Sequence, residues 1–126
     1  MSTRSLLLAL SLFLSGPALA NTEWINPRQG NNGDTYYVRL GSFEIVSTDV
    51  ARAWILRNLG TPAHGVSSNV VLWEFNCTTK QRRFVQVSHY SEPMGKGKVV
   101  FREGASAWNR VEPGSVGDRL LQGFCG

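Results

Sequence analysis

The stretch WNRVEPGSVGDRLLQGFC, residues 108–125, decides the fold of this chain, because it predicts a short helix that ends at a cysteine. Pro113 and Gly114 are typical of a turn. Ser115 follows at the N-cap position, with Asp118 three residues later, as in a weak capping box. The apolar residues that come next fall on roughly one face of a helical wheel, and they are Val116, Leu120, Leu121 and Phe124.

The helix ends at Cys125, and the only other cysteine in the chain is Cys77. The apolar, β-branched run NVVLWEFN, residues 69–76, leads directly into Cys77 and predicts a strand. If the two cysteines pair, the helix is attached across one face of a sheet. A disulfide that closes a loop of about 48 residues would contribute ~4 kcal/mol in the chain-entropy description.

The N-terminus carries the features of a secretory signal peptide. Arg4 precedes an apolar run at residues 6–14 that is too short to span a bilayer, and Ala-Leu-Ala at residues 18–20 forms a cleavage site. We expect cleavage after Ala20, which leaves about 106 residues, enough for one small domain. We therefore expect a periplasmic, cell-surface or secreted protein, in which two cysteines favour a disulfide over a metal or catalytic pair.

The segment after the cleavage site, residues 21–34, is polar and rich in turn residues. Its only large apolar residues are Trp24 and Ile25, so it is either a loose leader or a first edge strand. We therefore place the folded domain at residues 35–126. Alternation and β-branched content predict strands at residues 35–40, 43–46, 69–76, 82–90 and 98–102.

Residues 48–59 (TDVARAWILRNL) fit two structures equally well. The composition and the following Gly60 and Pro62 favour a helix, whereas the alternation across residues 50–58 also fits a strand. The total is five or six strands followed by one helix. Short turns indicate antiparallel pairing, so the predicted class is α+β, with a single antiparallel sheet and a helix on one face.

Charge gives a weak indication of a binding surface. The formal net charge is +4 at pH 7, and Lys80, Arg82 and Arg83 cluster after Cys77. We expect mainly a solvated surface, with attraction to lipopolysaccharide, a heparin-like glycan or an acidic protein as the sharper alternative, and no nucleic-acid partner. In the 82–90 strand, alternation predicts that Arg83 shares a face with Val85, Val87 and His89.

No motif indicates catalysis, a metal or a cofactor. The two histidines, His64 and His89, are far apart and have no ligand partner at a recognised spacing. Ser115 lacks the frame of a nucleophile elbow. We therefore predict a non-enzyme without a cofactor, although a deep pocket lined by His89 and a carboxylate would favour an enzyme.

Four tryptophans give this small domain large apolar side chains. We assign Trp54 and Trp108 to the core, together with the helix residues Leu120, Leu121 and Phe124. Of the other two, Trp24 and Trp73, one could lie exposed on a sheet face as a binding platform.

The chain resembles the surface-adhesin protein E family from about Tyr36 to Cys125. The resemblance rests on an ordered set of short pieces: Ala53-Trp54-Ile55-Leu56, Ser68, Asn76-Cys77, Arg82-Arg83, Tyr90, Met94-Gly95, Gly97-Lys98-Val99-Val100, Trp108, Val111-Glu112-Pro113-Gly114-Ser115 and Phe124-Cys125. The family's usual acidic residue before the first cysteine is Asn76 here.

This resemblance implies a six-stranded antiparallel sheet with a C-terminal helix tied to it by Cys77 and Cys125. It also implies a strand rather than a helix at residues 50–58. The founding member is an adhesin that binds host matrix and serum proteins, so the resemblance implies an adhesin-like module that binds a protein, glycan or lipopolysaccharide outside the cytoplasm. The alternative is a periplasmic inhibitor or envelope-stress protein, and Lys80, Arg82 and Arg83 are the candidate binding residues.

Overall fold

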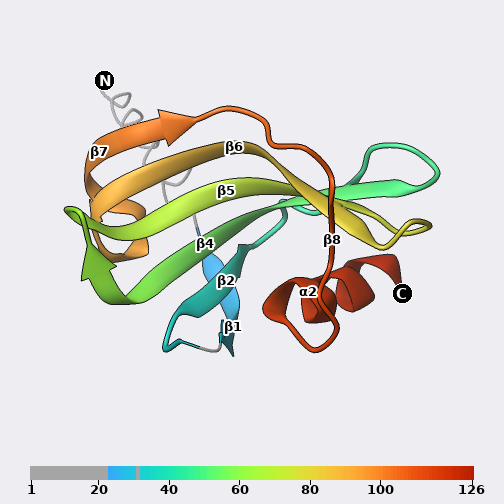
Figure 1. The fold of residues 1–126 in the computed structure, drawn as a ribbon, viewed down its shortest axis with the longest axis horizontal. Helices are drawn as coiled ribbons and strands as arrows, with labels where there is room; N and C mark the ends of the chain where they lie inside the picture. The colour runs from blue at the N-terminus through green and yellow to red at the C-terminus, as the bar shows by residue number, and fades with distance from the viewer. Residues whose placement is uncertain (1–22, 31) are drawn as a thin grey trace, which may run out of the picture.

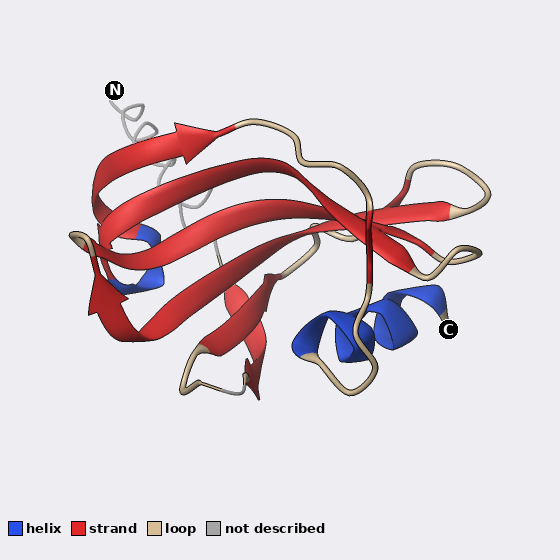
Figure 2. Ribbon diagram, in the orientation of Figure 1, coloured by secondary structure: helices blue, strands red, loops and turns tan. Residues whose placement is uncertain are grey.

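The computed structural model describes residues 23–30 and 32–126, so the predicted signal peptide lies outside the described residues. The described chain forms one antiparallel sheet followed by one α-helix (Figures 1 and 2). After the last long strand, the chain crosses in front of the sheet to reach the helix (Figure 1). The predicted α+β class is confirmed.

The described sheet has eight strands rather than about six. They are β1 (Trp24–Gln29), β2 (Thr35–Arg39), β3 (Glu44–Ile45), β4 (Val50–Ala63), β5 (Val66–Asn76), β6 (Gln81–Glu92), β7 (Lys96–Glu103) and β8 (Asn109–Arg110). Six of them follow the path β1-β2-β4-β5-β6-β7, while β3 pairs with β4 and β8 pairs with β6. The strands beyond the predicted six are β1, which lies in the polar segment at residues 21–34, and β8, which with two residues is too short to show an alternating pattern.

The ambiguous segment at residues 50–58 is part of a strand. It begins β4, which has 14 residues and pairs with β5 along most of its length. Ala51, Ala53 and Ile55 are all buried, and they alternate with half-buried side chains on the other face. The pairing of β4 with β2 and β5 and the burial of one of its faces therefore outweigh the helical preference of its composition.

The segment at residues 21–34 contains an edge strand. β1 pairs with β2, and its register shifts between Ile25 and Arg28, where Asn26 adopts a positive φ of 54°. The sheet therefore begins before residue 35.

A β-bulge interrupts the pairing of β5 with β6. Leu72 pairs with Gln86. The next residue, Trp73, pairs with Phe84, which leaves Val85 as the extra residue on β6. An extra residue exchanges the two faces of a strand from that point onward.

This exchange corrects the predicted alternation of β6. Arg82 shares a face with Val87 and His89, and Arg83 points to the opposite face. The prediction that placed Arg83 on the face of His89 was wrong, because alternation assumes a strand without a bulge.

The C-terminal helix α2 (Val116–Cys125) packs on one face of the sheet, called here the helix-side face. Ser115 is its N-cap, and the Ser115 side chain accepts a hydrogen bond from the Asp118 backbone N–H at 3.1 Å. Leu120 and Leu121 are buried against the sheet, and Phe124 packs against the edge of the same core. The opposite sheet face is called here the far face.

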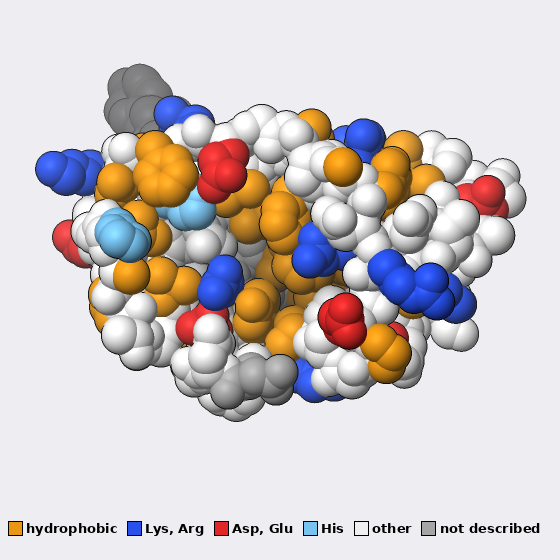
Figure 3. Space-filling view, in the orientation of Figure 1, with side chains coloured by type: hydrophobic (Ala, Val, Ile, Leu, Met, Phe, Trp, Pro, Cys, Tyr) orange, Lys and Arg blue, Asp and Glu red, His pale blue; other side chains and the backbone are white. Residues whose placement is uncertain are grey.

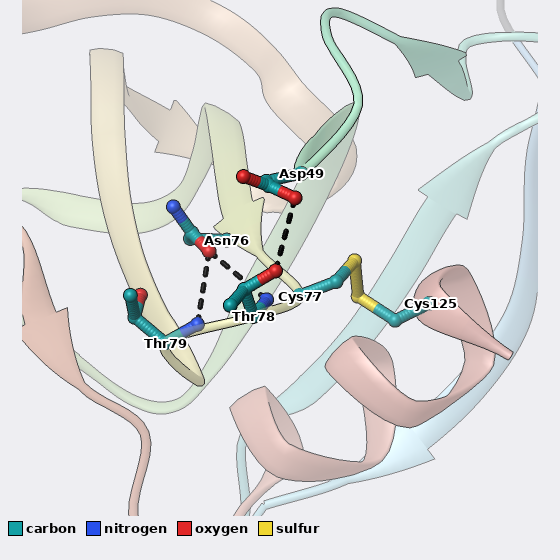
Figure 4. Close-up of a disulfide and its surroundings, with 6 residues drawn as sticks. All are labelled: Asp49, Asn76, Cys77, Thr78, Thr79 and Cys125. Atoms are coloured by element: carbon teal, nitrogen blue, oxygen red, sulfur yellow. Dashed lines mark hydrogen bonds between the residues drawn. A yellow bond between two sulfur atoms is a disulfide. The ribbon is translucent and has the colours of Figure 1, made fainter.

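The disulfide between Cys77 and Cys125 joins the end of β5 to the end of α2, as predicted (Figure 4). The two Cα atoms are 5.6 Å apart. The turn around Cys77 is ordered by Asn76, whose side-chain oxygen accepts from the backbone N–H groups of Thr78 and Thr79, each at 3.0 Å. The helix end is therefore attached to a well-organised hairpin turn.

The core tryptophan is Trp73 rather than Trp54 or Trp108. Trp73 lies on the helix-side face and contacts Phe75 and Phe84 with ring centroids 5.4 and 5.3 Å away. Trp54 follows Ala53 on β4, so it points to the far face and is only half-buried. Trp108 is also half-buried, in the connection before β8. The prediction followed side-chain size, whereas strand parity decides which tryptophan meets α2.

Candidate functional site

A cavity of about 550 Å³ opens on the helix-side face beside the first turn of α2. With ten residues, α2 is ~15 Å long, whereas a 14-residue strand such as β4 spans ~45 Å. The helix therefore covers only part of the face. Figure 3 shows hydrophobic side chains at the floor of the hollow and Lys or Arg side chains beside it.

The floor of the cavity is apolar. Ile55, Val71 and Val87 stand opposite one another on three adjacent strands, and all three are buried. Trp73 continues the floor towards α2. Such a floor favours the apolar body of a ligand.

The guanidinium of Arg82 lies over two aromatic rings in this cavity. It is 4.7 Å from the ring centroid of Phe84 and 5.5 Å from that of Trp73. Burial lowers the pKa of Arg82 from its usual value, because desolvation disfavours the charged form. Among the described residues, the Arg82 side chain makes no ion pair and donates no hydrogen bond. A half-buried cation therefore faces the cavity without an anion.

Two further polar side chains line the cavity. The Tyr36 ring meets Trp73 edge-on at 6.5 Å, and burial raises the pKa of its hydroxyl. Asn69 is only 6% exposed. Neither side chain has a hydrogen-bond partner within the described part of the chain. Both side chains line the cavity, so their polar groups are available to a ligand.

The cationic residue Arg57 is neutralised within the fold. Its guanidinium contacts one carboxylate oxygen of Asp34 from Nε and Nη2, each at 2.6 Å. The other Asp34 oxygen accepts from the Gly60 backbone N–H at 2.8 Å. This pair, in which Asp34 is buried, ties the β1–β2 loop to β4, and Arg57 adds little uncompensated charge to the cavity.

The cavity also contains His89 and a carboxylate. His89 Nε2 lies 2.6 Å from Glu103 Oε2, and its ring stacks on Phe101 at 4.0 Å. A histidine oriented by a carboxylate can act as a general base. Ser115 also lines the cavity, but its hydroxyl donates to the Glu112 carbonyl at 2.6 Å and serves as the helix cap.

The three predicted binding residues do not form one cluster. Lys80 is exposed in the β5–β6 turn, where its φ is 59°. Arg82 points into the cavity, whereas Arg83 points to the far face. The structure therefore joins Arg82 to the candidate site and separates Arg83 from it.

On the far face, Arg83 is held by a buried carboxylate. Arg83 Nε donates to Glu74 Oε1 at 2.8 Å, and its guanidinium lies 5.1 Å from the ring centroid of Trp108. Arg52 Nε lies 3.4 Å from the other Glu74 oxygen, without the alignment of a hydrogen bond. In this far-face cluster, both arginines therefore have a carboxylate partner within the fold.

A second surface feature is the apolar segment, defined as residues 40–46. Four large apolar side chains are exposed within it, and they are Leu40, Phe43, Ile45 and Val46. Ile45 has the largest exposed fraction, 64%. Phe43 stacks on Phe124 of α2 at 5.3 Å, so the segment continues the apolar surface at the end of the helix.

No metal centre was found in the described part of the chain, where no three His, Cys, Asp or Glu side chains are grouped closely enough. His64 is exposed in the β4–β5 turn. No helix of the described residues is long and apolar enough to cross a membrane.

Sequence reasoning missed Tyr36, Asn69 and the difference between Arg82 and Arg83. Tyr36 and Asn69 each lie in a predicted strand, and only the pairing of β2, β4 and β5 shows that they face the same cavity. A polar Asn69 within the apolar run NVVLWEF was the one available signal.

Comparison with known proteins identifies relatives of this architecture. A family model described as surface-adhesin protein E matches residues 24–126. Crystal form II of Haemophilus influenzae protein E has a TM-score of 0.62 and 17% identity, with 89% of this chain and 94% of that chain covered. The selenomethionine form has a TM-score of 0.59 and 16% identity, with 81% and 84% covered. No curated protein sequence matches the chain.

Proposed function

The chain belongs to the surface-adhesin protein E family, and from this premise we propose that it is a small exported binding module that performs no catalysis. Residues 1–20 act as the cleaved signal peptide, and the mature chain begins at Asn21. It works in the periplasm or at the cell surface. Its partner is a protein outside the cytoplasm, contacted through the apolar segment at residues 40–46.

The exposure of this segment is the observation that carries the proposal. Large apolar side chains gathered on the surface of a small domain mark an interaction site more often than a solvated surface. Among the described strands, β3 pairs only with β4, so its outer backbone edge is also free to pair. These features fit the apolar surface of a protein better than a glycan or lipopolysaccharide.

The test is binding of the mature chain, residues 21–126, to an array of matrix proteins, glycans and lipopolysaccharide at about 0.15 M and about 1 M salt. We expect a saturable protein partner whose affinity survives the higher salt. Ile45→Asp should weaken this binding at least ~10-fold, because it places a charge in the apolar contact.

Val100→Asp is the matched control, since Val100 is also an exposed apolar residue but lies on β7. It should leave the affinity unchanged. Binding restricted to lipopolysaccharide or glycans and lost at high salt would instead favour a charge-driven contact by Lys80 and Arg82. Equal binding by the Ile45→Asp variant would exclude the apolar segment.

One observation favours an enzyme as the second candidate, namely the contact of His89 with Glu103 inside the cavity. It supplies a base, but Ser115, the hydroxyl on the cavity wall, is engaged in the helix cap. We expect no turnover of p-nitrophenyl esters or phosphates. Turnover that His89→Gln abolishes would establish the enzyme and contradict the binding module.

A further inference from the structure

We infer that the cavity on the helix-side face binds a small amphipathic acid, with its carboxylate at Arg82 and its apolar body along Val71 and Val87. This site is separate from the apolar segment at residues 40–46. It therefore goes beyond the proposed binding of a protein partner and can be tested independently of it.

The unpaired guanidinium of Arg82 determines the charge of the ligand. Its stacking on Trp73 and Phe84 holds the planar group in place and leaves its N–H donors for another molecule. Arg57 is already paired with Asp34, and Glu103 is in contact with His89. Among the described residues that line the cavity, Arg82 is therefore the half-buried charge that has no counter-ion.

The rim carries one cation and one carboxylate, Arg110 and Glu112, and both are exposed. Water screens exposed charges strongly, so this pair has little influence on the interior. The half-buried Arg82 is desolvated, as its lowered pKa indicates, and a bound anion would favour its charged form. A carboxylate suits this position because guanidinium groups bind it through two parallel hydrogen bonds.

The remaining lining determines the body of the ligand. Val71 lies between Asn69 and Trp73 on β5, and these two residues are about 13 Å apart along the strand. An extended apolar chain or a short apolar peptide fits along this floor. The cavity volume lies within the range of small-molecule sites.

The polar groups of Tyr36 and Asn69, which have no hydrogen-bond partner among the described residues, support a ligand that also forms hydrogen bonds. The Tyr36 ring and the Arg82 guanidinium both contact the ring of Trp73, so both side chains lie in the same part of the cavity. The Tyr36 hydroxyl can donate to the same carboxylate. Asn69 is nine-tenths buried and lies at the other end of the cavity, where it can contact a polar group or an ordered water.

The test uses anilinonaphthalene sulfonate, an aromatic anion that fluoresces in apolar sites, as a reporter on the mature chain. Decanoate should displace it, and decanol, its uncharged counterpart, should displace it at least ~10-fold less effectively. Arg82→Gln should weaken decanoate binding at least ~10-fold. Tyr36→Phe, which removes only a hydroxyl, should weaken it ~3-fold.

Arg102→Gln is the matched control, because it removes the same charge from an exposed position on β7. It should bind decanoate as the wild type does, and so should Ile45→Asp. The side-chain amide resonance of Asn69 should shift on addition of decanoate in the wild type. If decanol competes as well as decanoate, or if Arg82→Gln binds normally, the inference is overturned.

A competition experiment with peptides shows whether the bound carboxylate belongs to a peptide C-terminus or to a free amphipathic acid. A tripeptide that ends in phenylalanine is compared as the free acid and as the C-terminal amide. Competition by the free acid alone assigns the site to peptide C-termini, whereas competition by decanoate alone assigns it to free amphipathic acids. If Ile45→Asp removes the reporter signal and Arg82→Gln does not, the reporter binds the apolar segment and the cavity site is excluded.

Discussion

Arg82 and Arg83 are neighbours in the chain, yet they occupy opposite environments on the two sheet faces. On the far face, Arg83 donates to the buried Glu74 and covers Trp108. On the helix-side face, Arg82 covers Trp73 and Phe84 and has no carboxylate partner among the described residues.

This difference separates a structural arginine from one that is available for binding. Both guanidinium groups lie over aromatic rings, so stacking does not distinguish them. The buried Glu74 carboxylate does, because it pairs with Arg83 and accepts the hydrogen bond from its Nε within the fold. An arginine without such a carboxylate gains most from an external anion.

The largest effect should follow from removing the cover of the helix-side face. Leu120→Asp places a carboxylate at a position that is 2% exposed. We therefore expect the free energy of unfolding to fall by about 4 kcal/mol or more, which would unfold the domain. Circular dichroism during thermal and urea unfolding would measure this. Gln122→Lys, which places a charge at an exposed position of the same helix opposite Asp118, should keep the wild-type melting temperature. A fully folded Leu120→Asp variant would mean that α2 is not needed for the sheet.

An intermediate effect should distinguish the two arginines. Glu74→Gln removes the carboxylate that pairs with Arg83 and Arg52. We expect the free energy of unfolding to fall by about 2 kcal/mol. The loss is smaller than for a fully buried ion pair, because both arginines are about one-third exposed. Arg83→Gln should lose about 1 kcal/mol. Arg82→Gln should change the free energy of unfolding by less than about 0.5 kcal/mol, because it breaks no ion pair.

Urea unfolding of these three variants at pH 7 provides the measurement. The contrast between the faces requires that Arg82→Gln be the most stable of the three. A loss at Arg82 as large as the loss at Glu74 would show that Arg82 has a structural role, and would contradict the separation drawn above.

The smallest effect is expected at Asp118, in the first turn of α2. This helix packs on the helix-side face of the sheet and not on the far face. Hydrogen bonds from the Gly114 backbone N–H and the Gln122 side chain lower the pKa of Asp118. A lowered pKa stabilises the fold above the unfolded-state pKa, and this contribution is lost as pH falls through the folded value. Asp118→Asn should therefore be slightly less stable than the wild type at pH 7 and should match it near pH 2. Equal stability at both pH values would show that the cap does not depend on this charge.

The sequence predicted the parts of the fold that depend on local patterns. The cap at Ser115, the apolar stripe of α2 and the pairing of Cys77 with Cys125 follow from spacing and from the exported context. The β4 strand did not follow from composition. Alternation left strand and helix equally possible, and the family resemblance favoured the strand. The reason is that Ala51 and Ala53 favour a helix by themselves, while their burial on the helix-side face requires a strand.

The candidate site was much less predictable, because one bulge residue, Val85, determines which side chains of β6 face the cavity. The bulge at Val85 exchanges the faces of β6, so Arg82 enters the cavity and Arg83 leaves it. Strand alternation has no means of locating such an extra residue. The same limit applies to Trp73, whose position in the core depends on register across three strands.

The attachment of α2 by its last residues has a consequence for the order in which the molecule matures. The sheet is a meander of mostly local hairpins, which can form as the chain emerges, but one wall of the cavity comes from Ser115, Val116 and Gly117 near the C-terminus. The disulfide that secures this wall requires an oxidising compartment. We therefore expect the folded domain and its pocket to be completed only once α2 has been made and the disulfide has formed.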